Sequence, residues 1–131
     1  MRHVLLDCYG IDARFLEDEA YLRAFLAAVP EQLGMQAVSP VYLENVTATS
    51  DPRDAGCSGF VIIATSHVSL HAWPPYGMLN LDCFSCNEFD PARPEILARA
   101  WFQPSDVEKR SIERAKRSPR PAAPMLASCA G

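Results

Sequence analysis

The sequence predicts an α+β protein, a two-layer sandwich in which helices pack on one face of an antiparallel sheet. Three observations lead to this prediction. The middle of the 131-residue chain contains three β-type runs, 58–64, 67–73 and 78–86, separated by short turns. Two segments, 17–29 and 90–101, have the three- and four-residue apolar spacing of amphipathic helices. Because strands and helices do not alternate regularly, the parallel sheet of a βαβ fold is disfavoured.

The pattern of the N-terminal third of the chain predicts one strand followed by one helix. Residues 2–9 form the first expected strand, and a turn at 10–12 ends it. The helix expected over 17–29 has acidic residues in its first turn, which favour the positive end of the helix dipole. We expect Pro30 and Gly34 to close this helix.

The remaining elements follow from turn signals and apolar pattern. A strand is expected at 41–47, and residues 50–56 form a polar loop rich in turn residues. Residues 74–77 connect the second and third central strands. Asp90 and Pro91 open the second helix, since a proline in the first turn loses no hydrogen bond. A last strand is expected at 107–112.

Length and charge indicate one domain that does not bind nucleic acid. At 14.5 kDa we expect a single domain over residues 1–117, followed at 118–131 by a disordered tail rich in Pro, Ala and Ser. The net charge of -4 divides into about -8 for residues 1–113 and a basic C-terminal stretch with Arg114, Lys116, Arg117 and Arg120. An acidic body cannot neutralise phosphates, so no nucleic-acid partner is expected.

The sequence also indicates the compartment. No apolar run approaches the ~18 residues of a membrane span, and the N-terminus lacks the pattern of a secretion signal. We therefore expect a cytoplasmic protein with no membrane partner. The five cysteines are an odd number, which argues against a disulfide framework and favours reduced thiols.

Two pairs of residues superficially resemble zinc ligands. His67 and His71 would share one face of a strand but stand about 13 Å apart, too far to bind one ion. Cys83 and Cys86 would point to opposite faces of their strand. We therefore expect no metal. A Ser/His/Asp hydrolase is disfavoured because the sequence contains no G-x-S-x-G elbow.

Ser66 is the most informative residue, because it stands at a break between the apolar run 60–64 and the alternating run 66–73. A serine held at a tight break between two strands can attack the preceding peptide bond. Further residues that can carry chemistry lie on neighbouring expected strands: Ser58, Ser69, His71 and Cys86. This grouping predicts a site, although a lone histidine on a strand is more often structural.

The segment 56–74, with Gly56-Cys57-Ser58-Gly59 and Thr65-Ser66-His67-Val68-Ser69-Leu70-His71-Ala72-Trp73-Pro74, resembles the centre of the bacterial and archaeal S-adenosylmethionine decarboxylase proenzymes. The resemblance continues through residues 76–77 and 81–86. It also reaches back to 2–7 and forward, weakly, to Phe102 and Arg114. It therefore covers most of the chain up to about residue 115.

The resemblance implies a self-processing, pyruvoyl-dependent decarboxylase of polyamine biosynthesis. Ser66 would attack the carbonyl of Thr65 and split the chain into a β chain, 1–65, and an α chain, 66–131. A pyruvoyl group derived from Ser66 would then form a Schiff base with the substrate and act as the electron sink, in the place of pyridoxal phosphate and without a metal.

The family pattern also assigns roles to other residues. Ser58 and His71 would assist processing, His71 as proton acceptor or donor, and Cys86 would be the proton donor to the substrate carbon. Trp73 is implied to contact the substrate. Further candidates for substrate binding are four carboxylates, Asp7, Asp51, Asp54 and Asp82. The implied assembly is a homodimer of processed αβ protomers.

Three departures from the family pattern concern the cleavage site and the substrate. Thr65 stands where the family typically has glutamate, but cleavage uses the backbone carbonyl. Pro75 replaces the glutamate that binds the ribose hydroxyls, and Pro52 falls where the family has a phenylalanine that stacks on adenine. Loss of a carboxylate that binds a diol weakens nucleoside binding well over tenfold, at about 1.5 to 3 kcal/mol per charge-assisted bond.

These departures predict a small basic amino acid as substrate, L-ornithine or L-arginine, with putrescine or agmatine as product. Two alternatives stay open. The chain is a genuine S-adenosylmethionine decarboxylase that supplies aminopropyl groups for spermidine, or it is an inactive relative that regulates an active decarboxylase.

Overall fold

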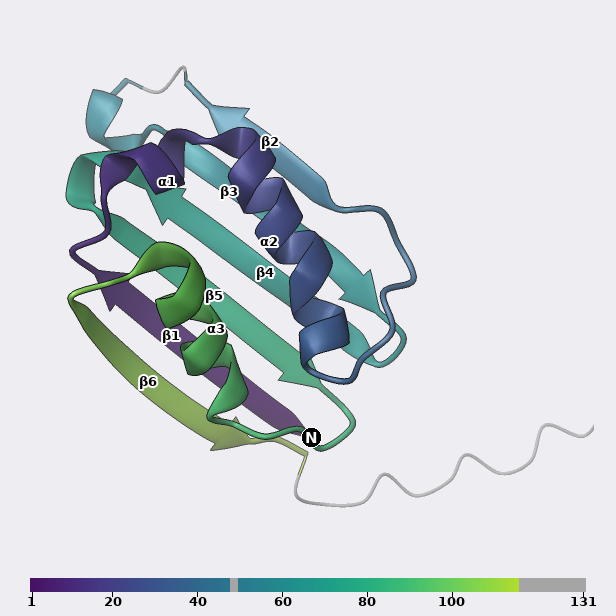
Figure 1. Cartoon of the computed structure of the whole chain (residues 1–131). Coiled ribbons are helices and arrows are strands. Elements are labelled where there is room, and N and C mark those ends of the chain that lie inside the picture. Colours follow the sequence, from purple (N-terminus) through teal and green to yellow (C-terminus); the bar gives the residue numbers. More distant parts are fainter. Residues whose placement is uncertain (48–49, 116–131) are drawn as a thin grey trace, which may run out of the picture.

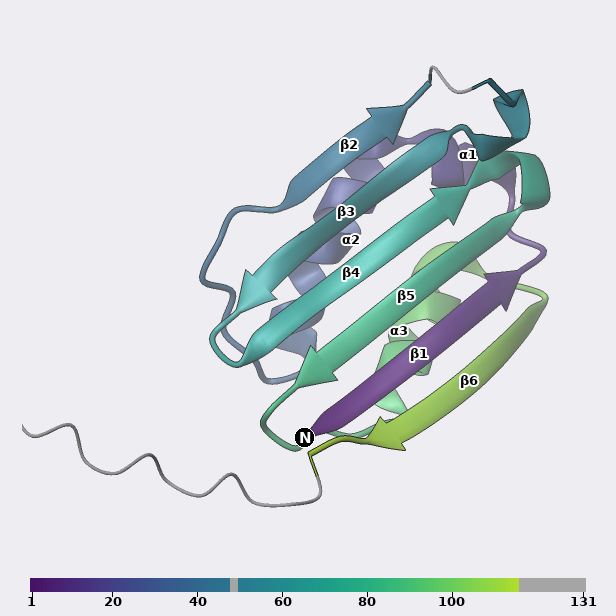
Figure 2. The same ribbon diagram turned by 180° about the vertical axis from the view of Figure 1, so that it is seen from behind.

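A computed structural model describes residues 1–47 and 50–115 as a six-stranded antiparallel sheet with helices on one face (Figure 1). The strand order is β2-β3-β4-β5-β1-β6. The strands are β1 (Arg2–Tyr9), β2 (Tyr42–Val46), β3 (Gly56–Ile63), β4 (Ser66–Trp73), β5 (Met78–Ser85) and β6 (Asp106–Glu113). Figure 2 shows the opposite face of the sheet, which none of the helices in the described residues covers. The predicted two-layer α+β architecture is confirmed.

The core lies between the sheet and the helices α1 (Ala13–Glu17), α2 (Glu19–Gln32) and α3 (Arg93–Phe102). In the central strands every second side chain is buried beneath the helices, as the period of two requires. The helices contribute their own apolar stripes, with Leu22, Phe25, Leu26 and Val29 from α2 and Leu97, Ala98 and Phe102 from α3.

The first helical segment differs from the expectation at both ends. The structure divides it into α1 and α2, because Asp18 adopts an extended backbone and its side chain accepts a hydrogen bond from the Tyr21 amide, which caps α2. Pro30 does not close the helix, as expected from the sequence, but lies inside its last turn. A proline there removes a single amide bond. Gly34, with φ +70°, follows the helix end.

The other bounds agree more closely. All six strands lie within two residues of their expected limits. Helix α3 begins at Arg93 rather than Asp90, because Asp90 forms a turn in which its Oδ1 accepts from the Ala92 amide at 2.9 Å. Two short 3₁₀ turns, η1 (Pro52–Asp54) and η2 (Pro74–Tyr76), were not expected.

The connectivity places distant parts of the chain side by side. β3 and β4 form a tight hairpin that turns at Ala64 and Thr65. β1 lies between β5 and β6, with Leu6 opposite Leu81 on one side and Lys109 on the other. Both halves of the sequence therefore supply strands to the middle of one sheet.

The expected domain bounds and the expected lack of a membrane span can be compared with the described residues only. The structure describes the expected domain, 1–117, as far as residue 115, and the expected tail, 118–131, lies outside the described residues. Within the described part, no helix is long and apolar enough to cross a membrane.

Candidate active site

The uncovered face of the sheet carries a row of polar residues that crosses all six strands. Each member lies opposite the next on the neighbouring strand, in the order Glu44, Ser58, His71, Asn80, Asp7 and Glu108. We call these six residues the polar row. On β1, β3, β4 and β5 the residues on either side of the row are buried in the core, so this row is fixed by strand register.

Ser58 and His71 form a hydrogen-bonded pair in the polar row. The Ser58 Oγ and the His71 Nδ1 are 2.8 Å apart. The pair lines a cavity of about 480 Å³ on the uncovered face, together with Tyr42, Leu43, Glu44, Gly59, Phe60, His67 and Ser69. This volume lies within the usual range for small-molecule sites. Of the nine lining residues, Glu44 is the only carboxylate.

Trp73 and Asp7, both expected to contact substrate, are connected through Asn80. The Trp73 Nε1 donates to the Asn80 Oδ1 at 2.7 Å, and the Asn80 Nδ2 donates to Asp7 at 2.7 Å. The second Asp7 oxygen accepts from Arg110 at 3.3 Å. Sequence reasoning missed Asn80, although its alternation with Asp82 on β5 places it on the uncovered face.

The other candidate carboxylates are not members of the polar row. Asp82 pairs with His3, whose Nε2 lies 3.0 Å from the Asp82 Oδ1. Asp51 caps η1 and is bonded to Arg53. Asp54 lines a small cavity that is also lined by Trp73 and by Ser58 of the polar row. The structure therefore gives Asp51 and Asp82 local partners and brings only Asp54 near an expected substrate residue.

A second group of candidates surrounds the Thr65–Ser66 bond at the β3–β4 turn. The Thr65 carbonyl oxygen accepts from the backbone N–H of Cys86 at 3.2 Å. The Thr65 hydroxyl lies 3.1 Å from the hydroxyl of Ser85, a residue that is 0% exposed. The Ser66 Oγ lies 3.4 Å from the Nδ1 of His67. Thr65, Ser66 and Cys86 are thus brought together.

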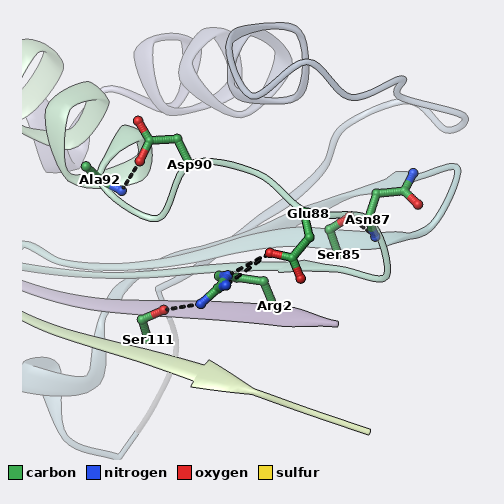
Figure 3. Close-up of polar contacts among 7 residues, drawn as sticks. All are labelled: Arg2, Ser85, Asn87, Glu88, Asp90, Ala92 and Ser111. Carbon is green, nitrogen blue, oxygen red and sulfur yellow. Dashed lines mark hydrogen bonds and ion pairs between the residues drawn. The ribbon is translucent and has the colours of Figure 1, made fainter. Parts of the chain in front are cut away.

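The turn that carries Cys86 is held by polar contacts (Figure 3). The Ser85 hydroxyl accepts from the Asn87 amide at 3.0 Å. Glu88 accepts from Arg2 of β1 at 3.0 Å, and Arg2 also reaches Ser111 of β6. Figure 3 shows Arg2 between these two partners. The position of Cys86 beside Thr65 therefore depends on three strands.

Ser85 is a second residue that sequence reasoning missed, because a serine in a strand carries no signal of its own.

The catalytic candidates form two groups rather than one. Ser66 and His71 are five residues apart on β4, which corresponds to about 16 Å. Ser58 lies opposite His71, and Cys86 lies beside Thr65. A single chain therefore does not bring Ser58 and His71 to Ser66. The sequence correctly predicted that these residues lie on or next to neighbouring strands. The two groups, however, occupy opposite ends of those strands.

Cys86 is the exposed cysteine of the described part, in which three other thiols are buried. Burial raises the pKa of Cys8 to about 11 and also raises the pKa of Cys57 and Cys83. Those three thiols therefore behave as small core residues. Within the described residues, no group of three or more His, Cys, Asp or Glu side chains is arranged to hold a metal ion.

A family model described as S-adenosylmethionine decarboxylase matches residues 2–115. The chain belongs to this family. The S-adenosylmethionine decarboxylase proenzyme of Archaeoglobus fulgidus is 34% identical over 87 residues, 66% of this chain and 71% of that protein. The Picrophilus torridus proenzyme is 28% identical over 113 residues, 86% of this chain and 82% of that protein.

The fold agrees with this assignment. A crystal structure of the adenosylmethionine decarboxylase from Aquifex aeolicus superposes with a TM-score of 0.73 at 25% identity and covers 86% of this chain and 88% of that chain. The family resemblance inferred from segment 56–74 is therefore confirmed, together with the fold.

Proposed function

We propose that this S-adenosylmethionine decarboxylase family member is a proenzyme that cleaves itself between Thr65 and Ser66 and becomes a pyruvoyl-dependent decarboxylase. The observation that carries the proposal is the contact between the Thr65 carbonyl oxygen and the Cys86 N–H. A backbone donor at a carbonyl stabilises the negative charge that develops when a nucleophile attacks its carbon. The nucleophile here is the adjacent hydroxyl of Ser66.

The residues around Ser66 fit the formation of a pyruvoyl group there. Ser66 begins β4 between Ile63 and Ser85, where the sheet ladder fixes its backbone. The pyruvoyl group would supply the electron sink for decarboxylation. Cys86 lies next to this position with an exposed side chain, so it can deliver a proton to a carbon held at Ser66.

The complete site requires a second copy of the chain. His71 lies about 16 Å from Ser66 along β4, and Ser58 lies opposite His71 on β3, so we infer that both serve the Ser66 of another copy. The uncovered face of the sheet also exposes several large apolar side chains, namely Tyr42, Val46, Phe60, Ile62 and Ile112. Such a patch favours association. We therefore propose a face-to-face homodimer with two composite sites.

The proposed substrate is a small basic amino acid, L-ornithine or L-arginine. Pro75 lies in η2 and offers no charge to a ribose. The carboxylate of Glu44 lines the same cavity as Ser58 and His71. Asp7 belongs to the same polar row, two strands beyond His71. A carboxylate in such a cavity can bind the distal ammonium or guanidinium of the substrate.

S-adenosylmethionine remains the second candidate, for two reasons. The relatives from Archaeoglobus fulgidus and Picrophilus torridus carry that substrate in their names. The rings of Tyr42 and Phe60 also line the cavity, with centroids 5.0 Å apart, and an aromatic pair can stack on adenine.

The test is direct. The purified chain is incubated at neutral pH and weighed by mass spectrometry, with Ser66→Ala as the uncleavable control. Cleavage into two fragments at Ser66 supports self-processing, and an intact chain near 14.5 kDa contradicts it and favours the regulatory relative. Carbon dioxide release from ornithine, arginine and S-adenosylmethionine, measured in parallel, then identifies the substrate. If S-adenosylmethionine alone reacts, the basic amino acid proposal is wrong.

A further inference from the structure

Self-cleavage at Ser66 requires a group that accepts the proton of its hydroxyl. A serine hydroxyl is a weak nucleophile unless an adjacent base removes that proton. The histidine that the family pattern assigns to processing, His71, lies about 16 Å along β4 from Ser66. Within one chain it cannot reach the hydroxyl.

A different histidine already contacts the nucleophile. The Nδ1 of His67 lies 3.4 Å from the Ser66 Oγ. This distance is at the long end for a hydrogen bond, as is common for catalytic contacts before the reaction begins. His67 is therefore the imidazole within reach of the attacking oxygen.

The ring of His67 is held by its neighbours on the uncovered face. His67 lies opposite Phe84 of β5, and their ring centroids are 5.9 Å apart in an edge-on arrangement. Phe84 also contacts His3, with ring centroids 5.4 Å apart, and the guanidinium of Arg114, which lies 4.3 Å from the Phe84 ring centre. These ring contacts favour the orientation in which the His67 Nδ1 lies near Ser66.

We propose that His67 is the general base of self-cleavage and acts on the Ser66 of its own chain. This inference rests on the proposed self-processing and adds a residue that the family pattern did not assign. His71, in contrast, would act from the second copy on a later proton transfer. The two histidines of the sequence H-x3-H line the same cavity but act on different Ser66 residues, His67 on that of its own chain and His71 on that of the second copy.

The attack of Ser66 on the Thr65 carbonyl needs no further reactant. The Ser66 Oγ forms a bond to the Thr65 carbonyl carbon, and the hydroxyl proton passes to the His67 Nδ1. The Cys86 N–H stabilises the resulting oxyanion. The bond between the Thr65 carbonyl carbon and the Ser66 nitrogen then breaks, and His67 returns the proton to that nitrogen. The products are an ester and a free amine.

The first experiment measures the rate of cleavage rather than decarboxylation. Wild-type, His67→Gln and His67→Ala chains are made by cell-free synthesis, and the cleaved fraction is followed by mass spectrometry. We expect both variants to cleave about 10²- to 10⁴-fold more slowly, the usual contribution of a general base. Added imidazole should partly restore His67→Ala and not Ser66→Ala. Cleavage of His67→Gln at the wild-type rate would overturn the proposal.

Folding is controlled by comparing melting temperatures with Ser66→Ala, which is also uncleaved. His67→Gln keeps the size and polarity of the side chain, so it remains informative if His67→Ala does not fold. Rescue by imidazole also identifies a chemical role, because a merely structural defect would not respond to a free base.

A complementation experiment separates this inference from the proposed dimer. Co-expression of Ser66→Ala with His71→Ala should restore cleavage at one site, because Ser66 and His71 come from different copies. Co-expression of Ser66→Ala with His67→Ala should not, since Ser66 needs the His67 of its own chain. If Ser66→Ala with His67→Ala restores cleavage, the proposed role of His67 is wrong and the composite site is not affected. If Ser66→Ala with His71→Ala fails to restore cleavage, the composite site is wrong, and the cleavage rates of the His67 variants still test the role of His67.

Discussion

The two ends of the β3–β4–β5 region differ in how they hold their functional groups. At the Ser66 end, the scissile Thr65 carbonyl accepts from the Cys86 backbone amide, and the Thr65 side-chain hydroxyl contacts the buried Ser85 hydroxyl. At the His71 end, side chains lie side by side on an uncovered face over a cavity of about 480 Å³. The first end holds the scissile bond, the Ser66 nucleophile and Cys86 of one chain. The second is open and accepts groups from outside.

Replacing the side chains of the two ends separately tests this division most strongly. Cys86→Ala keeps the backbone N–H that holds Thr65, so we expect cleavage to continue while decarboxylation falls about 10²- to 10⁴-fold. His71→Ala should instead slow cleavage itself. Mass spectrometry and carbon dioxide release, applied to both variants, measure the two steps. Equal defects in both steps for both variants would show that the ends do not divide the work.

The open face can be tested with a matched pair of isoleucines. Ile62, 42% exposed, lies on the uncovered face, whereas Ile96, 52% exposed, lies on α3. If two copies meet through the uncovered face, the interface contains Ile62 of both copies. Ile62→Asp then removes two buried apolar side chains, and each costs about 1.5 kcal/mol or more of binding free energy. We expect the dimer Kd to rise at least about 100-fold. Analytical ultracentrifugation measures this, and an equal effect of Ile96→Asp would contradict the proposed interface.

Substrate choice gives a smaller expected effect. Pro75→Glu restores the carboxylate of the family pattern, so we expect the affinity for S-adenosylmethionine to rise more than tenfold, at about 1.5 to 3 kcal/mol per charge-assisted bond. Pro75→Gln has the same length without the charge and should gain less. Isothermal titration with both variants measures the difference. If the affinity does not change, Pro75 is not the cause of a shifted substrate.

The smallest expected effect concerns the stability of the Ser66 end. Ser85→Ala leaves the Thr65 hydroxyl and the Asn87 amide without their buried partner, so we expect a loss of about 1 to 2 kcal/mol in the free energy of unfolding. Ser69→Ala on the uncovered face should change it by less than about 0.5 kcal/mol. Urea denaturation of both variants in the Ser66→Ala background avoids interference from cleavage. Equal losses would show that Ser85 has no special role.

The sequence predicted the architecture well because apolar alternation reports burial directly. β1, for example, alternates from Val4 to Cys8 and lies where the pattern placed it. Pro30 was misjudged because a proline near a helix end costs one hydrogen bond, which the packing of Phe25, Leu26 and Val29 outweighs. The start of α3 was misjudged because Asp90 caps a turn as readily as a helix.

The site was predicted in part. Segment 56–74 identified Ser58, Ser66 and His71 as candidates, but register decides which of them meet, and register requires both strands of a pair. Asn80 and Ser85 were missed since their roles come from cross-strand partners that are distant in sequence. The separation of Ser66 from His71 could have been obtained from strand spacing alone, as was done for His67 and His71.

The position of β1 between β5 and β6 has a consequence for the cleaved protein. Residues 1–65 supply β1, β2 and β3, and the rest of the described chain supplies β4, β5 and β6. After cleavage at Ser66, the strand order β2-β3-β4-β5-β1-β6 interleaves the two products, with β1 of one fragment paired on both sides by strands of the other. The fragments can separate only by breaking three strand ladders, so the nicked molecule should melt as one cooperative unit, and neither product should exchange with free fragment below the unfolding temperature.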